Sequence, residues 1–535
     1  MKKTRLILQR KEVDHMAQIM VSNLTFAYEG SYDNIFENTS FSIDTDWKLG
    51  FVGRNGKGKT TFLNLLLGKY EYSGNIASSA VFDYFPYKLC NKDNEKTADE
   101  LIEDWKAGVE SWRVICELAQ MGCEADLLYR PYRTLSFGER TKVMLAVLFS
   151  GENDFLLIDE PTNHLDRDAR AIVKTYLANK KGFILVSHDR DLLDACVDHM
   201  LVLNRNSIEV QSGNFTSWWE NKKRADSFAR AENEKHLKEI NKLKAAADRT
   251  ARWADKSERS KIGFDPVKEH DRSIATRAYI GAKTKKMQAR VSSYENRVAR
   301  EIEEKEGLLN DIETIADLKL MPLSFHKSRL IECRDFSLKY CDGETPVIND
   351  LNMELKQGER LFISGDNGCG KSSLIKAILQ HTLAVDNVVF EQTNGQVSEK
   401  LNYETSGQLS VAANLVISYI NQDTSYLRGT IKEYASKRQL DYTLLLSLLR
   451  QLAFERNQFA KNMEEFSEGQ KKKVLIAASL LTPAHLYIWD EPLNYIDVFS
   501  RMQIEKLIQT YEPTMLIVEH DVRFREKIAT RVIEM

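Results

Sequence analysis

Two stretches of the sequence have the residue types and spacing that bind a phosphate group. One runs from Gly53 to Lys59 and is followed by Thr60, and the other runs from Gly365 to Lys371 and is followed by Ser372. Glycines let backbone N–H groups wrap a phosphate, the lysine reaches its outer oxygens, and the hydroxyl can ligate Mg²⁺. The predicted phosphate-binding residues are Gly53, Asn55, Gly56, Gly58, Lys59, Thr60, Thr61, Gly365, Asn367, Gly368, Gly370, Lys371, Ser372 and Ser373.

A pair of carboxylates follows each phosphate loop at the end of an apolar stretch. FLLIDE ends in Asp159 and Glu160, and LYIWDE ends in Asp490 and Glu491. A strand that ends there delivers its aspartate to Mg²⁺ and its glutamate to a water molecule that attacks the terminal phosphate. The paired motifs therefore predict ATP hydrolysis with Mg²⁺ as cofactor, and the two glutamates are the predicted catalytic carboxylates.

A histidine follows a further apolar stretch in each half of the chain. His188 comes after FILVS and His520 after MLIVE, 28 and 29 residues beyond the respective glutamates. A lone histidine after a strand is usually structural, but the repeated placement favours contact with the terminal phosphate of ATP. We therefore count both histidines among the predicted catalytic residues.

All these motifs belong to one internal repeat that covers most of the chain. VSNLTFAY recurs as CRDFSLKY, and LSFGERTKVMLA recurs as FSEGQKKKVLIA. The loop lysines Lys59 and Lys371 are 312 residues apart, whereas Glu160 and Glu491 are 331 apart. The second copy therefore contains a net insertion of 19 residues, which we place in the polar stretch Glu391–Ser410.

Each phosphate loop must be held between a strand and a helix. Leu49–Val52 and Leu361–Ser364 predict strands that lead into the loops, and the segments after the loops predict helices. A length of 535 residues with only 25 Gly and 9 Pro favours two large α/β domains with long regular elements. We place these domains at residues 19–213 and 323–535, after an N-terminal extension, residues 1–18, of unknown role.

The composition excludes several classes of protein. No stretch reaches the ~18 consecutive apolar residues that a membrane span needs, and the basic N-terminus lacks the apolar core and cleavage site of a signal peptide. The seven cysteines contain no CxxC pair and no metal-ligand spacing, which favours a reducing compartment over a disulfide framework. We expect a cytoplasmic protein without a membrane domain.

Residues 214–322 predict an antiparallel helical hairpin that links the two domains. The first helix is predicted over Phe215–Lys261 and the second over Ala282–Asp317, with the tip at Ile262–Ile280. Trp218 and Trp219 lie at the base, where we expect them to pack onto the first domain. The predicted seam of the second helix has three-and-four spacing and consists of Met287, Val291, Tyr294, Val298, Leu309 and Ile312.

Positive charge is concentrated in this hairpin. Residues 221–300 contain 22 Lys and Arg against 11 Asp and Glu, a net charge of +11. Since the whole chain carries −3, the remainder carries −14. A solvated hairpin could be charged without purpose, but a basic arm on an acidic body suits phosphate backbones, and aromatic side chains suit stacking on RNA bases. The candidate RNA-contacting residues are Trp253, Phe264, Lys268, Arg272, Arg277 and Tyr279.

These motifs resemble those of the ATP-binding cassette superfamily. Two cassettes on one chain, joined by a charged helical connector and without a membrane part, resemble its translation-associated ABC-F group. The resemblance implies that the halves pair head to tail, so that each ATP lies between the phosphate loop of one half and the signature segment of the other. One site then combines the loop of Lys59 with Ser467 and Gly469, and the other combines the loop of Lys371 with Ser136 and Gly138.

The resemblance also implies adenine and magnesium contacts. Tyr28 and Tyr340 each precede the first loop glycine by 25 residues, at the adenine-stacking position, although either could be a core aromatic residue. Gln422 matches a magnesium-ligating glutamine. The first half has Tyr87 at the corresponding place, and a phenol cannot ligate Mg²⁺ as an amide carbonyl does. We therefore expect two unequal sites.

The ABC-F resemblance implies that the linker enters the ribosomal E site and reaches toward the P-site tRNA and the 23S rRNA. The compact first cassette, the long tip and the segment WDEPLNYID resemble the antibiotic-resistance branch, whose members protect the peptidyl-transferase centre from lincosamides, pleuromutilins and streptogramin A. A housekeeping translation factor would share every ATPase residue and stays an alternative. A transporter ATPase subunit is a further alternative, against which the fused basic hairpin argues. We expect a monomer in which the cassettes pair within one chain.

Overall fold

The computed structural model describes most of the chain, which divides into two compact units. One unit consists of the residues up to Trp218 together with those from Ala316 onward, and the other spans Trp219–Ile315. The predicted tip, the N-terminal residues 1–17 and residues 391–402 lie outside the described part. The described residues are 18–28, 34–90, 93, 95–151, 154–163, 165–204, 207–259, 285, 289, 292–293, 297–298, 322–341, 345–383, 403–452, 454 and 456–535.

The first half of the chain contains a six-stranded sheet in the order β5-β6-β7-β3-β8-β9. Neighbouring strands are parallel except for the antiparallel pair β8–β9. A smaller antiparallel sheet, β2-β1-β4, accompanies it. The strands are β1 (Gln18–Phe26), β2 (Phe36–Asp44), β3 (Lys48–Val52), β4 (Ser73–Ala77), β5 (Val81–Phe85), β6 (Asp154–Asp159), β7 (Phe183–Val186), β8 (His199–Leu203) and β9 (Ile208–Ser212).

The second half repeats this arrangement. Its parallel sheet has the order β14-β15-β16-β12-β17, and its antiparallel sheet has the order β11-β10-β13. The strands are β10 (Arg329–Tyr340), β11 (Ile348–Lys356), β12 (Arg360–Ser364), β13 (Tyr403–Val411), β14 (Ile417–Ile420), β15 (Leu486–Asp490), β16 (Met515–Val518) and β17 (Arg531–Glu534). The predicted α/β architecture with two cassettes is confirmed.

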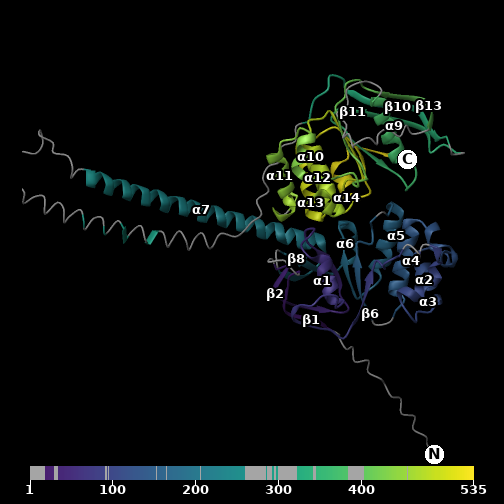
Figure 1. The fold of residues 1–535 in the computed structure, drawn as a ribbon, viewed down its shortest axis with the longest axis horizontal. Helices are drawn as coiled ribbons and strands as arrows, with labels where there is room; N and C mark the ends of the chain where they lie inside the picture. Colours follow the sequence, from purple (N-terminus) through teal and green to yellow (C-terminus); the bar gives the residue numbers. More distant parts are fainter. Residues whose placement is uncertain are drawn as a thin grey trace, which may run out of the picture. The chain divides into compact units, whose positions relative to one another are not determined.

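Helices cover the parallel sheets, and in the second half α10 to α14 gather in one group (Figure 1). Those of the first half are α1 (Lys59–Leu66), α2 (Ala98–Trp105), α3 (Ser111–Gln120), α4 (Phe137–Phe149), α5 (Arg167–Ala178) and α6 (Arg190–Cys196), with 3-10 turns at Ala125–Tyr129 and Tyr132–Thr134. Those of the second half are α9 (Lys371–Leu383), α10 (Ile431–Lys437), α11 (Tyr442–Gln451), α12 (Glu468–Leu481), α13 (Val498–Tyr511) and α14 (Val522–Ile528), with 3-10 turns at Arg456–Ala460 and Met463–Glu465.

The parallel sheet of the second half separates two hydrophobic cores. On β12, Leu361 and Ile363 pack into the core shared with β10, β11 and α9, whereas Phe362 packs into the core shared with α10 to α14. On β16, Leu516 and Ile517 divide between the same two cores. Because side chains alternate along a strand and both faces are covered, the buried positions of these strands are apolar on both faces. This burial holds the strand ends that carry the motifs.

The predicted strand–loop–helix order is present at both phosphate loops. In the first half β3 ends at Val52 and α1 begins at Lys59, one residue before the expected start. In the second half β12 ends at Ser364 and α9 begins at Lys371. The loops are therefore the turns between a buried strand and the helix that follows it.

The inserted residues of the second half lie earlier than expected. β13 pairs with β10 as β4 pairs with β1, and the registers make Ser406 and Ser410 the counterparts of Ser73 and Ala77. The placement of the insertion over Glu391–Ser410 is therefore wrong for the part from Ser406 onward, which is sheet present in both halves. β13 is an edge strand with mostly exposed, polar side chains. In the sequence, a polar stretch of this kind looks the same as an inserted loop.

In the linker, α7 is one continuous helix over Phe215–Arg259, and Figure 1 shows it as a single long element. The described residues of the second predicted helix, 285, 289, 292–293 and 297–298, are helical, and Val298 is buried. None of the described helices is both long enough and apolar enough to cross a membrane. All seven cysteines are free thiols.

Candidate active sites

Both phosphate loops wrap around the ammonium group of their own lysine. Lys59 Nζ donates to Gly53 O at 2.8 Å and to Asn55 Oδ1 at 3.2 Å, and Lys371 Nζ donates to Gly365 O at 2.8 Å. The turn into α1 needs glycine, because Gly58 has φ +105° and a Cβ there would lie 2.5 Å from a side-chain carbon. The predicted loop residues therefore form a cradle around a positive charge, which is the arrangement that attracts a phosphate.

The hydroxyl that follows each lysine lies against the aspartate of the acidic pair. Thr60 Oγ1 donates to Asp159 Oδ2 at 3.0 Å, and Ser372 Oγ donates to Asp490 Oδ2 at 2.9 Å. Burial raises the pKa of Asp490 to about 6. Its Oδ1 atom is buried without a hydrogen-bond partner among the described residues. An orphaned carboxylate oxygen beside a hydroxyl fits a divalent cation.

The donor set favours Mg²⁺ among such cations. In the described ranges no three or more His, Cys, Asp or Glu side chains form a cluster that could hold a metal by themselves. From the phosphate loop and the acidic pair, a cation at either site would therefore have one hydroxyl and one carboxylate. Mg²⁺ held through one or two carboxylates together with substrate phosphates has this kind of environment.

The two glutamates are aimed by a left-handed backbone turn at the end of the strand. Glu160 has φ +53° and Glu491 has φ +46°, an uncommon conformation for residues with a side chain. His188 Nε2 lies 3.3 Å from Glu160 Oε1, and His520 Nε2 lies 3.5 Å from Glu491 Oε1. The structure therefore brings together each glutamate and histidine that the sequence placed 28 or 29 residues apart.

The electrostatic environments of the two glutamates differ. Burial, with the charge of Asp159 adding to it, raises the pKa of Glu160 to about 8. Burial also acts to raise the pKa of Glu491, but the contacts with His520 and Asn494 outweigh it and hold the value below the usual range. Burial lowers the pKa of His188 well below its usual value, so this imidazole is neutral. The expectation of unequal sites therefore has a physical basis beyond Tyr87.

The first phosphate loop contacts the second half of the chain. Asn55 Nδ2 donates to Tyr495 O at 2.7 Å, and a Cβ added to Gly469 would lie 3.2 Å from Asn55 Nδ2. Ser467 is the N-cap of α12 and forms a capping box with Gln470, as Ser136 does at α4. The loop of Lys59 and the segment of Ser467 and Gly469 are thus neighbours. The structure places Gly138 against Ala169 of its own cassette, so its pairing with Lys371 stays a prediction.

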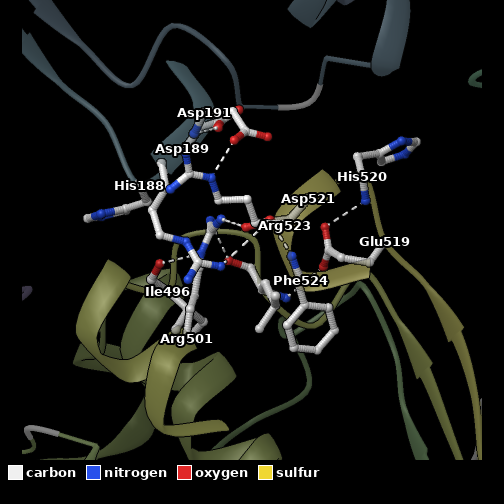
Figure 2. Close-up of polar contacts among 12 residues, drawn as sticks. His188, Asp189, Asp191, Ile496, Arg501, Glu519, His520, Asp521, Arg523 and Phe524 are labelled. Atoms are coloured by element: carbon white, nitrogen blue, oxygen red, sulfur yellow. Dashed lines mark hydrogen bonds and ion pairs between the residues drawn. The ribbon is translucent and has the colours of Figure 1, made fainter. Parts of the chain in front are cut away.

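Charged residues that the sequence analysis missed lie next to these sites, and one of them, Arg523, connects the halves. Figure 2 shows Arg501 of α13 reaching Ile496 O and Asp521, with hydrogen bonds of 2.9 Å to both. Arg523 of α14 pairs with Asp191 of α6, in the first half. These residues lack a motif of their own. The only signal in the sequence is that each follows an acidic or histidine motif within a few residues.

The tyrosines expected at the adenine position have matching contacts. The hydroxyls of Tyr28 and Thr61 lie 2.8 Å apart, and those of Tyr340 and Ser373 lie 2.7 Å apart. The Tyr28 side chain is 42% exposed. Both phenols are thus anchored next to a phosphate loop, and the exposed Tyr28 ring offers a stacking surface.

The first site has a tyrosine that the sequence analysis overlooked. Tyr87 donates to Asp83 at 2.7 Å and stacks on Trp105. Tyr84 donates its hydroxyl to Asp159 Oδ2 at 3.1 Å. Gln422 lies exposed two residues after β14, as Tyr87 lies two residues after β5. The two proposed cation sites therefore differ through Tyr84 as well as through Tyr87.

The expectation that Trp218 and Trp219 pack onto the first cassette stays a prediction, and Trp218 also contacts the second cassette. Trp218 is buried and packs on Phe499 of α13, in the second half, with ring centroids 6.0 Å apart. Thr216, at the start of α7, also lies 3.4 Å from Arg523 of the second half. Trp253 belongs to α7. The other candidate tip residues, Phe264, Lys268, Arg272, Arg277 and Tyr279, lie outside the described residues.

Comparison with known proteins adds the following. A family model described as "ABC transporter" matches residues 36–163 and 348–494, together more than half of the chain. The chain is 25% identical to the "Ribosome protection protein VmlR" of Bacillus subtilis over 516 residues, which covers 95% of this chain and 85% of that protein. It is 24% identical to the "ATP-binding protein Uup" of Buchnera aphidicola, covering 97% and 79%.

A solved structure of an archaeal ribosome recycling factor, aABCE1, in complex with the ribosomal stalk protein aP1 has a similar fold. The TM-score is 0.58 at 19% identity, with 96% of this chain and 87% of that chain covered. At this identity the likeness concerns the fold. The arrangement of two cassettes in one chain is therefore one that solved structures share.

Proposed function

The chain belongs to the ATP-binding cassette family, in its ABC-F group, and from this premise we propose that it is a ribosome-bound ATPase that protects the peptidyl-transferase centre from antibiotics. The drugs we propose are of the lincosamide, pleuromutilin and streptogramin A type. The observation that carries the proposal is the similarity over nearly the full length to a ribosome protection protein, together with a long helix between two complete cassettes.

The chain hydrolyses ATP, and we propose these roles for its residues at the first site. Lys59 exchanges the carbonyls of its loop for phosphate oxygens, while Thr60 and Asp159 hold the cation. When bound, Mg²⁺ neutralises charge that develops on the transferred phosphoryl group. Glu160 orients and deprotonates the attacking water, and the neutral His188 can donate one hydrogen bond to the terminal phosphate.

We propose the same roles at the second site for the corresponding residues. Lys371 binds phosphate, Ser372 and Asp490 hold the cation with Gln422, and Glu491 with His520 acts on the water. Ser467 and Gly469 complete the first site from the opposite half, which the 2.7 Å contact of Asn55 with Tyr495 supports. Ser136 and Gly138 complete the second. Since the chain supplies both halves, we propose a monomer.

We propose that the linker carries the protective action. The described helix α7 is rich in basic residues, and the segment 221–300 has a net charge of +11. Positive charge of this density favours contact with the phosphate backbone of RNA. The linker would lie in the ribosomal E site, with its tip toward the P-site tRNA and the 23S rRNA, and ATP-driven closure of the cassettes would set its direction.

A housekeeping translation factor is the second candidate. The identity to the ATP-binding protein Uup, 24% over 97% of this chain, nearly equals the identity to the protection protein. Both candidates predict ribosome binding and ATP hydrolysis. They differ in whether the protein restores translation that an antibiotic inhibits.

A double variant, Glu160→Gln with Glu491→Gln, tests the proposal. We expect it to bind ATP without hydrolysis, to remain on ribosomes in a pelleting assay, and to inhibit cell-free translation. The wild-type chain should restore translation that lincomycin or tiamulin inhibits. If the double variant does not pellet with ribosomes in the presence of ATP at moderate salt, ribosome binding is refuted. If it binds but the wild type gives no drug protection, the housekeeping candidate is supported.

A further inference from the structure

In the second cassette, the helix of the signature segment is attached to the loop that contains Gln422. We call α12 (Glu468–Leu481) the signature helix and residues 421–430 the Gln422 loop. The hydroxyl of Thr424 donates to Glu468, at the first turn of the signature helix. Lys472 Nζ, one turn further, donates to Asn421 O at 2.9 Å. Both Thr424 and Lys472 are buried. Two independent hydrogen bonds thus join these elements.

Lys472 also reaches the acidic pair of the second site. Its Nζ lies 3.4 Å from Glu491 O, and its nearest charges include Asp490 and Glu491. The residue Lys472 is only 3% exposed. Its ammonium group therefore makes its contacts away from solvent, where hydrogen bonds from a charged donor are strong. Lys472 therefore joins three elements: the signature helix, the Gln422 loop and the end of β15.

At the positions that correspond to this attachment, the first cassette has other residue types. Phe137 stands where the second half has Glu468, and Leu89 stands four residues after β5 as Thr424 stands four residues after β14. Neither side chain has a polar atom. Thr141 stands where the second half has Lys472, and its hydroxyl donates to Phe137 O within the same helix at 3.0 Å.

The first signature helix is attached to a different segment. Arg140 of α4 donates to Tyr132 O at 3.2 Å and to Arg133 O at 2.8 Å, both in the turn that precedes the helix. Hence α4 is hydrogen-bonded to the turn that precedes it in the chain, whereas α12 is hydrogen-bonded to the Gln422 loop. The internal repeat has diverged at the points where the two elements touch.

The signature helix of the second cassette begins next to the first phosphate loop. Gly469 approaches Asn55, and Asn55 contacts Tyr495 of the same half as the signature helix. A displacement of the Gln422 loop would therefore be passed through Thr424, Glu468 and Lys472 to residues that border the first site.

We propose that Thr424, Glu468 and Lys472 are positioning residues that couple nucleotide binding at the second site to nucleotide affinity at the first. The inference rests on the proposed composite ATP sites. Because coupling in binding is reciprocal, ATP at the first site changes affinity at the second by the same factor. The attachment in the second cassette carries this coupling in both directions.

The test measures the coupling with one site active at a time. In the Glu491→Gln background only the first site hydrolyses ATP, and its apparent KM is measured with the second site intact or blocked by Lys371→Ala. The ratio of the two KM values is the coupling factor. Thr424→Val removes the hydroxyl at constant shape, Thr424→Ser retains it, and Thr141→Ala alters the matched position of the first signature helix.

We expect a coupling factor of at least about fivefold in the parent. Thr424→Val should bring it close to one, because a hydrogen bond to a charged group contributes roughly a tenfold factor. Thr424→Ser and Thr141→Ala should leave it unchanged. Lys472→Thr, which installs the residue type of the first half, should also lower it. Damage to folding alone would reduce kcat with and without Lys371→Ala and leave the ratio of KM values as it was.

The outcomes separate this inference from the proposed function. A factor near one in the parent, an unchanged factor in Thr424→Val, or an equal loss in Thr141→Ala would overturn the coupling role. In each of these cases the ATPase assignment stands as long as the single variants Glu160→Gln and Glu491→Gln still hydrolyse ATP. Absence of hydrolysis in both single variants would instead refute two independent catalytic sites.

Discussion

Arg190 of the first cassette forms an ion pair with Glu505 of the second, with Nη1 3.2 Å from Oε2 and both side chains no more than 4% exposed. Arg190 follows His188 by two residues and begins α6, while Glu505 belongs to α13. A buried charge that loses its partner is strongly destabilising, whereas an apolar replacement of both partners is tolerated far better. The pair therefore connects the halves two residues after His188, which we propose to be catalytic.

Removing one member of this pair should destabilise the contact between the halves. We expect Arg190→Met to lower the free energy of unfolding by about 3 kcal/mol, because the buried Glu505 then retains only the more exposed Lys527 as a partner. Differential scanning calorimetry measures the change. The double variant Arg190→Met with Glu505→Leu should recover most of the loss, and Lys527→Gln, which removes the exposed partner of Glu505, should change little. Equal stability of Arg190→Met and wild type would contradict the role of the pair.

The two sites should differ in their dependence on pH. Glu160 acts as a base only when it is deprotonated, and its pKa of about 8 leaves about a tenth of it deprotonated at pH 7. The pKa of Glu491 lies below its usual range, so this carboxylate is ionised throughout the neutral range. Hydrolysis by Glu491→Gln, which retains the first site, should rise between pH 6.5 and 9. Hydrolysis by Glu160→Gln should be nearly flat there, and identical pH profiles would refute the assignment.

The hydroxyl of Tyr84 should compete with the cation at the first site. It donates to Asp159 Oδ2, the oxygen that also accepts from Thr60, and so lowers the availability of that oxygen as a ligand. We expect Tyr84→Phe to lower the apparent KM for Mg²⁺ about threefold in the Glu491→Gln background. Tyr419→Phe is the matched control in the second half, where the hydroxyl donates to Asn421 at 3.4 Å. A higher KM for Mg²⁺ in Tyr84→Phe would indicate that the hydroxyl orients the carboxylate instead.

Arg523 should transmit the state of the second cassette to the base of the linker. It contacts Asp191 and Asp194 of α6 and lies 3.4 Å from Thr216 at the start of α7. We expect Arg523→Gln to keep basal ATP hydrolysis within about twofold, since exposed or half-buried pairs contribute little to stability. Its retention on ribosomes, measured by pelleting in the Glu160→Gln, Glu491→Gln background, should fall. Lys527→Gln on the same helix is the control, and full retention by Arg523→Gln would show that the contact is only structural.

The sequence by itself determined the parts of this protein whose chemistry depends on local order along the chain. A phosphate loop must have glycines and a lysine at a set spacing, and buried parallel strands must be apolar throughout, so both cassettes and each pair such as Glu160 with His188 could be predicted. Repetition of every motif in two copies strengthened these predictions, and the structure brings the predicted residues of each loop together.

Only the tertiary structure decided which residues act between segments that are distant in the chain. Arg190 meets Glu505 across 315 positions, Tyr84 reaches Asp159, and Trp218 contacts Phe499 of the second cassette. Such contacts have no spacing rule, because an ion pair or a ring contact requires proximity in space and leaves no period in the sequence. The difference between the two signature helices is of the same kind: each substitution alone is ordinary, and its effect follows only from what the folded chain places beside it.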